Sequence, residues 1–386
     1  MKRDSRSDHE PQVALPDALR RAPGGPAEHG RGATFNPANR FRRETREACD
    51  DGWQTETHDL AQATDEPLPR LKTTVMIQHA RTIISRNDSP DVYFTQSINP
   101  YQGCEHGCIY CYARPTHAYL DLSPGLDFET RLFAKPNAAE LLRSELRKPG
   151  YRCDPIALGT NTDPYQPIER EHRITRQVLA VLAEHEHPFS IVTKSSLVER
   201  DLDIIAPMAA KGMARVHLSI TTLDREIART LEPRAAAPQR RLQTLRVMAD
   251  AGVPVGVMVA PVIPQLTDKD LEAILEAAYA SGARYAGWIM LRLPREVAPL
   301  FRDWLDAHFP LRAAHIMSIV QQIRGGRDYD STFGTRMSGE GAFADLIEAR
   351  FARVCKRLGF NPERAPLDTS HFRPPRPPGP QQLELL

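Results

Sequence analysis

The sequence carries almost no net charge and has few cysteines. Its 50 Lys and Arg residues are matched by 49 Asp and Glu residues, so the formal charge over 386 residues is +1. Bulk charge therefore encodes no general attraction to nucleic acid or to an anionic membrane. Six cysteines in a chain of this length are too few for a disulfide scaffold.

Long apolar runs are also missing. The most apolar stretch, residues 251–263, is interrupted by Pro254 and Pro261, whereas a membrane-spanning helix needs about 20 apolar residues. Residues 1–6 contain no apolar core of a signal peptide. We therefore expect a cytoplasmic protein without a membrane partner, in which cysteines serve more often as metal ligands or reactive groups than as disulfides. The phosphate-binding patterns G-x-x-x-x-G-K and G-x-G-x-x-G do not occur.

The two ends of the chain differ from its middle. Residues 1–75 lack sustained apolar periodicity, which predicts an extension that is largely disordered or forms a surface strap. Within it, residues 35–43 interleave aromatic and Arg side chains, a pattern that fits either a nucleic-acid-binding arm or a strap packed on the domain. The proline-rich residues 361–386 predict a disordered, extended tail.

Strand and helix patterns alternate between these ends. We expect strands at 92–99, 155–159, 189–193, 216–220, 253–259 and 285–291. The helices expected after them are 138–147, 175–185, 201–211, 240–250, 268–280 and 296–308. Helices at 311–323 and 343–358 close the domain within a helical or lid segment, 311–360. Six strand–helix units predict an α/β fold with a parallel sheet, either open and doubly wound or curved like a barrel.

Three cysteines are clustered directly after the first expected strand. Cys104, Cys108 and Cys111 have the spacing C-x3-C-x2-C, and Gly103 and Gly107 let the loop wrap a compact object. Thiolates at this spacing suit an iron–sulfur cluster or zinc. Because a four-iron cluster normally takes four protein ligands, three clustered cysteines leave one iron open.

Zinc remains an alternative, since His106 or His117 could complete a four-ligand site. The other cysteines, Cys49, Cys153 and Cys355, are scattered singly and are best interpreted as small buried hydrophobes or incidental thiols. Two alternative functions follow from the triad: a zinc-stabilised nucleic-acid-binding module, or an iron–sulfur electron-transfer protein.

The triad, Tyr110 before its last cysteine and the six strand–helix units together resemble the radical S-adenosylmethionine (SAM) superfamily over residues 91–308. The resemblance implies a partial (β/α)6 TIM-like barrel over residues 90–310. It also implies a 4Fe-4S cluster on the three cysteines, SAM on the fourth iron, and a one-electron reductant such as flavodoxin or ferredoxin. Such an enzyme cleaves SAM reductively to a 5′-deoxyadenosyl radical, which abstracts hydrogen from a substrate.

Five segments further resemble the spore photoproduct lyase branch and its photolyase-like bacterial relatives: 99–104, 111–114, 159–166, 192–195 and 217–220. This resemblance implies that Thr162, Lys194 and Ser219 contact SAM and that Tyr110 lies beside its adenine. It also implies a nucleic-acid substrate and a role in DNA repair.

One position departs from the lyase pattern. Thr160 stands where the lyase has the cysteine that donates a hydrogen atom. A Thr hydroxyl does not readily give up a hydrogen atom, so either another donor such as Tyr112 or Tyr165 serves or the substrate differs.

Two further features, Arg234 and residues 329–341, indicate a binding role from the residues alone. Arg234, in the sequence Glu232-Pro233-Arg234, is the best single candidate for binding a phosphate or carboxylate, and we count it among the cofactor-binding residues. Its alternative is a salt-bridged helix face. The Gly-rich and hydroxyl-rich residues 329–341 predict either a lid over the site or a long connection.

Overall fold

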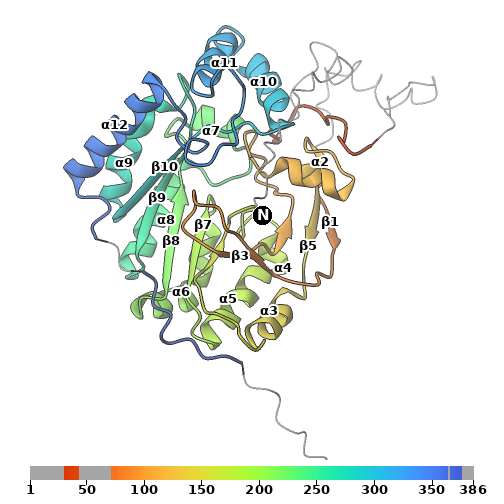
Figure 1. The fold of residues 1–386 in the computed structure, drawn as a ribbon, viewed down its shortest axis with the longest axis vertical. Coiled ribbons are helices and arrows are strands. Elements are labelled where there is room, and N and C mark those ends of the chain that lie inside the picture. The colour runs from red at the N-terminus through yellow and green to blue at the C-terminus, as the bar shows by residue number, and fades with distance from the viewer. Residues whose placement is uncertain (1–29, 43–70, 364–365, 376–386) are drawn as a thin grey trace, which may run out of the picture.

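A curved seven-stranded sheet forms the centre of the computed structural model, which describes residues 30–42, 71–363 and 366–375 (Figure 1). Its strands lie in the order β10-β9-β8-β7-β6-β3-β2. All neighbours are parallel except β2, which pairs antiparallel with β3 at one edge. The strands are β2 (Ile84–Arg86), β3 (Gln96–Ile98), β6 (Ile156–Leu158), β7 (Phe189–Thr193), β8 (Ala214–Ser219), β9 (Val255–Val262) and β10 (Tyr285–Met290).

Burial on both faces explains why these segments form a parallel sheet. Every residue of β6 is buried, and Ile191, Val216 and Val257 in the next three strands have no exposed surface. Parallel strands covered on both faces are typically continuous apolar runs rich in Val and Ile. Because these strands are parallel, their carboxyl ends meet at one edge of the sheet.

Helices connect the parallel strands and cover the outer face of the sheet (Figure 1). The main ones are α3 (Ala138–Leu146), α5 (Ile174–Glu184), α6 (Leu202–Ala210), α8 (Pro238–Asp250) and α9 (Leu271–Ala280). Shorter elements precede some of them: α4 (Glu169–His172), α7 (Arg225–Leu231) and 3-10 turns at Ser196–Asp201 and Asp268–Asp270. Strand–helix–strand crossovers of this kind curve the sheet into a partial barrel, so the expected α/β partial (β/α)6 fold is confirmed.

The first expected strand is shorter than the sequence predicts. Instead of 92–99, only β3 at Gln96–Ile98 is a strand of the large sheet. The chain then enters β4 (Tyr101–Gln102), so the cysteines do not follow β3 directly. A second sheet, in the order β1-β5-β4, contains β1 (Thr74–Ile77) and β5 (Arg131–Ala134) and was not expected.

Three helices follow the last strand. They are α10 (Val297–His308), α11 (Ala313–Gln322) and α12 (Ala342–Leu358), close to the predicted ranges. An apolar core separate from the main one joins α10 and α11 to the cysteine segment, with Ile109 and Trp304 both fully buried in it. None of the helices in the described part of the chain is long and apolar enough to cross a membrane.

The segment 30–42, here called the N-terminal strap, lies against the strand-end face of the domain (Figure 1, red). Asn39 donates a hydrogen bond to the carbonyl of Ala118 at 2.9 Å, and Arg40 pairs with Glu296 at 2.8 Å. Most of the residues interpreted above as an arm or strap therefore pack on the domain, whereas Arg43 lies outside the described residues.

Part of the proline-rich C-terminal segment also packs on the domain. The backbone N–H of Arg373 donates to the carbonyl of His185 at 2.9 Å, and the Phe372 ring contacts Tyr151 and His187. Residues 376–386 of the predicted tail lie outside the described residues.

Candidate active site at the strand ends

A cavity of about 430 Å³ opens where the six parallel strands end. Each strand or the loop after it contributes to the wall. The lining includes Cys104, Tyr110, Thr160, Lys194, Ser219, Met258, Trp288 and Arg292. Since the carboxyl ends of parallel strands are the usual place for a site in barrels of this kind, the cavity is the candidate active site.

All three clustered cysteines line this cavity. Turn hydrogen bonds shape their loop: the N–H of Gly107 donates to the carbonyl of Cys104, and that of Cys111 donates to the carbonyl of Cys108. Gly107 has φ of 69°, and a Cβ there would lie 2.7 Å from a carboxylate oxygen of Glu129, so only glycine fits. The loop is thus a series of tight turns that places the three cysteines in the wall of one cavity.

The loop is held from behind by Arg114 and Glu129, which form an ion pair with no exposed surface on either side chain. The Arg114 guanidinium also donates to the carbonyls of Cys108 at 2.9 Å and Gly107 at 3.1 Å. Five donors in a rigid fork suit this multiple contact. Sequence reasoning quoted Arg114 within a motif but gave it no role, although its place three residues after the last cysteine was the available signal.

Burial raises the pKa of all three thiols in the cavity wall. The pKa of Cys108 rises to about 12 through burial and the nearby Glu232 carboxylate, partly opposed by Lys194. Those of Cys104 and Cys111 are also raised, mainly by burial. The thiols are free rather than disulfide-bonded. Buried thiols with no partner are costly to ionise, so a bound cation or cluster would have to displace their protons.

These thiols fit a cluster better than a single ion. Within the described ranges, no group of three or more His, Cys, Asp and Glu side chains is placed to hold one metal ion. A four-iron cluster differs because each thiolate binds a separate iron. Three free thiols that line one cavity are compatible with such a cluster.

Lys194 and Ser219 come together on the cavity wall. The ammonium of Lys194 donates to the hydroxyl of Ser219 at 3.0 Å and lies 5.7 Å from the centroid of the Tyr110 ring. The backbone N–H of Lys194 donates to Asp163 at 2.8 Å. Burial alone would raise the pKa of Asp163, but His106 and these hydrogen bonds lower it to about 2, so the carboxylate stays ionised.

Tyr110 is fixed by a buried polar network. Its hydroxyl donates to the Glu232 carboxylate, which also forms an ion pair with Arg241. The Thr221 hydroxyl donates to the same carboxylate at 2.6 Å. Burial opposes ionisation of Glu232, yet Arg241 and then Lys194 lower its pKa to about 2. The network therefore holds the Tyr110 ring rigidly against the cavity.

Two of the residues predicted to bind a cofactor lie outside the cavity lining. The Thr162 hydroxyl donates to the carbonyl of Tyr101 at 3.0 Å, and only 2% of the residue is exposed. Arg234 forms an ion pair with Glu105 at 2.8 Å, beside the cysteine loop. The cavity lining brings Tyr110, Lys194 and Ser219 together with the three cysteines. Thr162 and Arg234 are not part of this lining.

Of the two alternative hydrogen donors, only one reaches the cavity. Tyr112 lines it, and its hydroxyl donates to the carbonyl of Thr160. Tyr165 is fully buried elsewhere, with its hydroxyl donating to Asp201 at 3.0 Å. Residues 329–341 also reach the site, because Met337 is part of the cavity wall.

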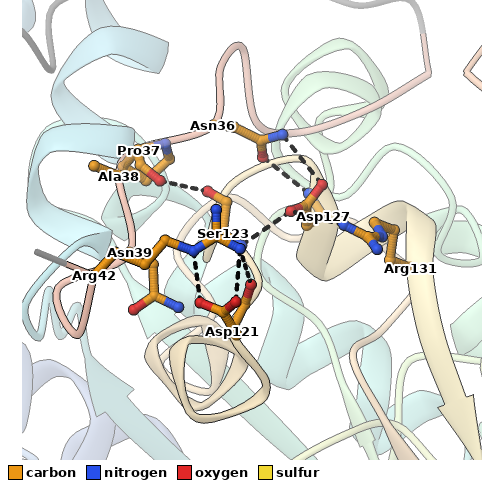
Figure 2. Close-up of a pocket in the computed structure, with 9 residues that line it drawn as sticks. All are labelled: Asn36, Pro37, Ala38, Asn39, Arg42, Asp121, Ser123, Asp127 and Arg131. Atoms are coloured by element: carbon orange, nitrogen blue, oxygen red, sulfur yellow. Dashed lines mark hydrogen bonds and ion pairs between the residues drawn. The ribbon is translucent and has the colours of Figure 1, made fainter. Parts of the chain in front are cut away.

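A second, smaller cavity of about 260 Å³ lies between the N-terminal strap and the segment 121–131 (Figure 2). Its charged groups are already paired: Arg42 binds Asp121 at 2.6 Å, and Arg131 lies 3.8 Å from Asp127. Asn36 exchanges hydrogen bonds with Asp127. The polar contacts around this cavity attach the strap to the domain.

Known relatives share about half of the chain. A protein of Mycobacterium bovis, described as uncharacterised, is 42% identical over 219 residues, which are 56% of this chain and 64% of the relative. The chain thus spans less than two thirds of that relative's length. An uncharacterised protein of Methanocaldococcus jannaschii is 26% identical over 213 residues, 55% of this chain and 76% of that protein.

Solved structures share the fold. Spore photoproduct lyase complexed with dinucleoside spore photoproduct gives a TM-score of 0.52 at 17% identity, covering 74% of this chain and 80% of the lyase. A lyase variant with bound AdoMet and the same dinucleoside gives the same score, identity and coverage. Residues 98–278, which contain the cysteine triad and the strands from β4 to β9, match the model of the Radical SAM superfamily. The part of the chain that carries the cysteine triad is therefore similar to the radical SAM superfamily.

Proposed function

We propose that Cys104, Cys108 and Cys111 bind a 4Fe-4S cluster and that SAM binds in the adjoining cavity. The observation that carries the proposal is the shared wall: the three thiols line the same cavity as Lys194 and Ser219. An open coordination position next to a cation and a hydroxyl suits a ligand with a carboxylate and an amino group.

The bound cluster supplies one electron, which cleaves SAM to methionine and a 5′-deoxyadenosyl radical for hydrogen abstraction from substrate. Lys194 binds the SAM carboxylate, and Ser219 orients the Lys194 ammonium through their hydrogen bond. Tyr110, held by Glu232, provides a rigid face for the adenine ring. The apolar remainder of the wall keeps water away from the reactive species.

Thr162 and Arg234 act as positioning residues in this proposal. Thr162 donates to the carbonyl of Tyr101 in β4, the strand just before the cysteine loop. Arg234 pairs with Glu105 inside that loop, and its backbone N–H donates to the carbonyl of His106. Both therefore fix the loop rather than touch SAM.

The substrate contains nucleotide units in this proposal, and the reaction on it is left unassigned. A fold similar to a lyase complexed with a dinucleoside supports the substrate class. So does the aromatic wall, which includes Tyr93, Phe94 and Tyr112 and offers faces on which bases stack. Thr160 lines the cavity and cannot serve as the lyase's thiol donor, so we do not assign repair of spore photoproduct.

The proposal is tested by anaerobic reconstitution with iron and sulfide, followed by dithionite and SAM. We expect brown protein with about four irons, and 5′-deoxyadenosine as a product. Ala substitution of Cys104, Cys108 or Cys111 should remove both. Cys153→Ala is the matched control, because Cys153 lies before β6, at the opposite end of the strand from the cavity.

Three results would contradict the proposal. A colourless protein with one zinc favours the zinc-stabilised module. A brown protein that neither binds nor cleaves SAM favours an electron-transfer protein. An equal loss of iron in Cys153→Ala shows that the triad has no special role. In the cell, the dithionite is replaced by a one-electron donor of the flavodoxin or ferredoxin class.

A further inference from the structure

Arg292 is a cavity residue that the cluster and SAM do not use. It lies two residues after the end of β10 and lines the same cavity as the cysteine triad. It was not singled out in the sequence, because one arginine among many at a strand end carries no pattern. Its contacts in the structure set it apart from the other charged groups around the site.

All contacts of Arg292 within the described residues are with uncharged groups. Its Nη2 donates to the Tyr329 hydroxyl at 3.1 Å, and its Nη1 lies 3.5 Å from the sulfur of Met337. The guanidinium carbon is 5.3 Å from the Tyr112 ring centroid and 5.8 Å from that of Tyr329. Its Nε is buried and has no hydrogen-bond partner. A buried N–H without a partner is costly, so a donor of this kind beside a cavity favours an acceptor group on a bound ligand.

The neighbouring charges do not neutralise Arg292. Asp163 in the wall faces His106 at 3.4 Å, and Asp91 forms an ion pair with Arg336. Behind Arg292 lies a second cation, Arg324, which is 2% exposed and donates to the carbonyls of Leu291 and Thr335. Arg324 interacts electrostatically with the Asp330 carboxylate, whereas none of the described carboxylates forms an ion pair with Arg292, so the positive charge of Arg292 stays unpaired in the wall.

Such a charge is costly unless something compensates it. Removing an ion from water carries a large penalty, which a protein normally offsets with an opposite charge and hydrogen bonds. Tyr112 and Tyr329 offset part of it through their ring faces. The remaining donors of the planar guanidinium fork match the two oxygens of a phosphate or carboxylate.

We propose that Arg292, whose guanidinium lies beside the rings of Tyr112 and Tyr329, binds an anionic group of the substrate, a phosphate or a carboxylate. The inference rests on the proposed function, because it assigns Arg292 to the substrate and Lys194 to SAM. The rest of the substrate is flat and largely apolar, since Val92, Phe94 and Trp288 also line the cavity. A nucleotide unit, with a base and a phosphate, has this combination.

The test measures binding of four probes to the reconstituted, SAM-loaded protein by anaerobic isothermal titration calorimetry. Phenyl phosphate and benzoate each carry an anionic group on a flat ring, while phenol and benzamide are their uncharged counterparts. We expect at least one anionic probe to bind tenfold or more tightly than its counterpart. The probe with the larger preference identifies phosphate or carboxylate as the anion.

Substitutions assign that preference to one residue. Arg292→Gln should abolish it, and Arg292→Lys should retain part of it, because Lys keeps the charge but loses the fork. Arg357→Gln is the matched control, because Arg357 forms a surface ion pair with Glu276 on the outer helices. The Arg357→Gln protein should bind the probes as the wild type does. Circular dichroism and iron content identify any variant that fails to fold.

The wild-type protein contradicts the inference if it shows no preference for the anionic probes, and so does a preference that survives in Arg292→Gln. Weaker SAM binding in Arg292→Gln with unchanged probe binding would assign the residue to the cofactor instead. Iron content and 5′-deoxyadenosine yield are measured in the same samples. A wild type that forms no cluster or product therefore refutes the proposed function, whereas an active protein with Arg292-independent binding refutes only this inference.

Discussion

Arg114 and Glu129 form an ion pair inside the protein that also organises the cysteine loop. Arg114 reaches the carbonyls of Gly107 and Cys108, while Glu129 accepts the backbone N–H groups of Gly32 and Ala33 at 3.0 and 2.8 Å. The pair thus links the cysteine loop on one side to the N-terminal strap on the other.

Removing the charge of Arg114 should destabilise the protein and its cluster together. Arg114→Met leaves the Glu129 carboxylate buried without its cation, which costs about 3–5 kcal/mol of unfolding free energy. Urea unfolding measures that loss, and iron content after reconstitution should fall with it. Arg143→Met is the control: its partner Glu184 is half exposed, so the expected loss is below about 1 kcal/mol. Equal losses in the two variants would refute the assigned role.

Replacing Lys194 should weaken SAM binding and spare the cluster. Lys194→Gln removes the ammonium that donates to Ser219. A hydrogen bond to a charged group contributes about 1.5–3 kcal/mol, so SAM affinity should fall by roughly tenfold to a hundredfold. Equilibrium dialysis of SAM and iron analysis test this, with the exposed Lys269→Gln as control. Loss of iron in Lys194→Gln would show that the residue supports the cluster instead.

A methyl group at Gly32 should separate the strap from the cysteine loop. A Cβ at this position would lie 1.8 Å from the carbonyl oxygen of Gly107, closer than any real contact, and that oxygen belongs to the backbone and cannot rotate away. Gly32→Ala should therefore cost about 1–3 kcal/mol of stability and speed proteolysis of the strap. Ala38→Ser, at an exposed strap position, should change neither. If the strap of Gly32→Ala is cleaved at the same rate as that of the wild type, the strap does not pack as described.

Acidification should destabilise the protein through His187. Burial lowers the pKa of His187 from 6.5 to about 4, so between these pH values the unfolded chain binds more protons than the folded one. Stability is therefore full above about pH 6.5 and falls as the pH drops toward 4, by up to about 3 kcal/mol from this residue. Urea unfolding of wild type and His187→Asn from pH 7 to 4 measures the difference. Parallel stability curves would contradict the prediction.

The sequence predicted the large sheet well because its strands are buried on both faces. Both ends of β7 agree with the expected strand, Phe189–Thr193, in which every residue except Val192 is buried. The first strand was predicted four residues too long at its start. Val92 and Phe94, whose apolar character suggested a strand, line the cavity instead. Apolar residues that face a ligand cavity cannot be distinguished by pattern from residues that face a core.

The site was only partly accessible to sequence reasoning. The cysteines, Lys194 and Ser219 could be placed together because each follows or ends a strand. Glu129 could not, because its partners Gly32 and Ala33 lie 97 and 96 positions away in the chain. Arg292 was missed for a similar reason: what marks it is the lack of a carboxylate partner among the described residues, which depends on the whole fold.

The bond from the strap to Glu129 also bears on how the protein is assembled. The cysteine loop is not a self-contained motif, because its supporting carboxylate takes two donors from a segment that is synthesised before any strand of the barrel. A shortened version that starts at β1 would present the same three cysteines on a loop whose rear support is incomplete. Cluster insertion would then compete with local unfolding, so cofactor content should depend on where a recombinant version begins.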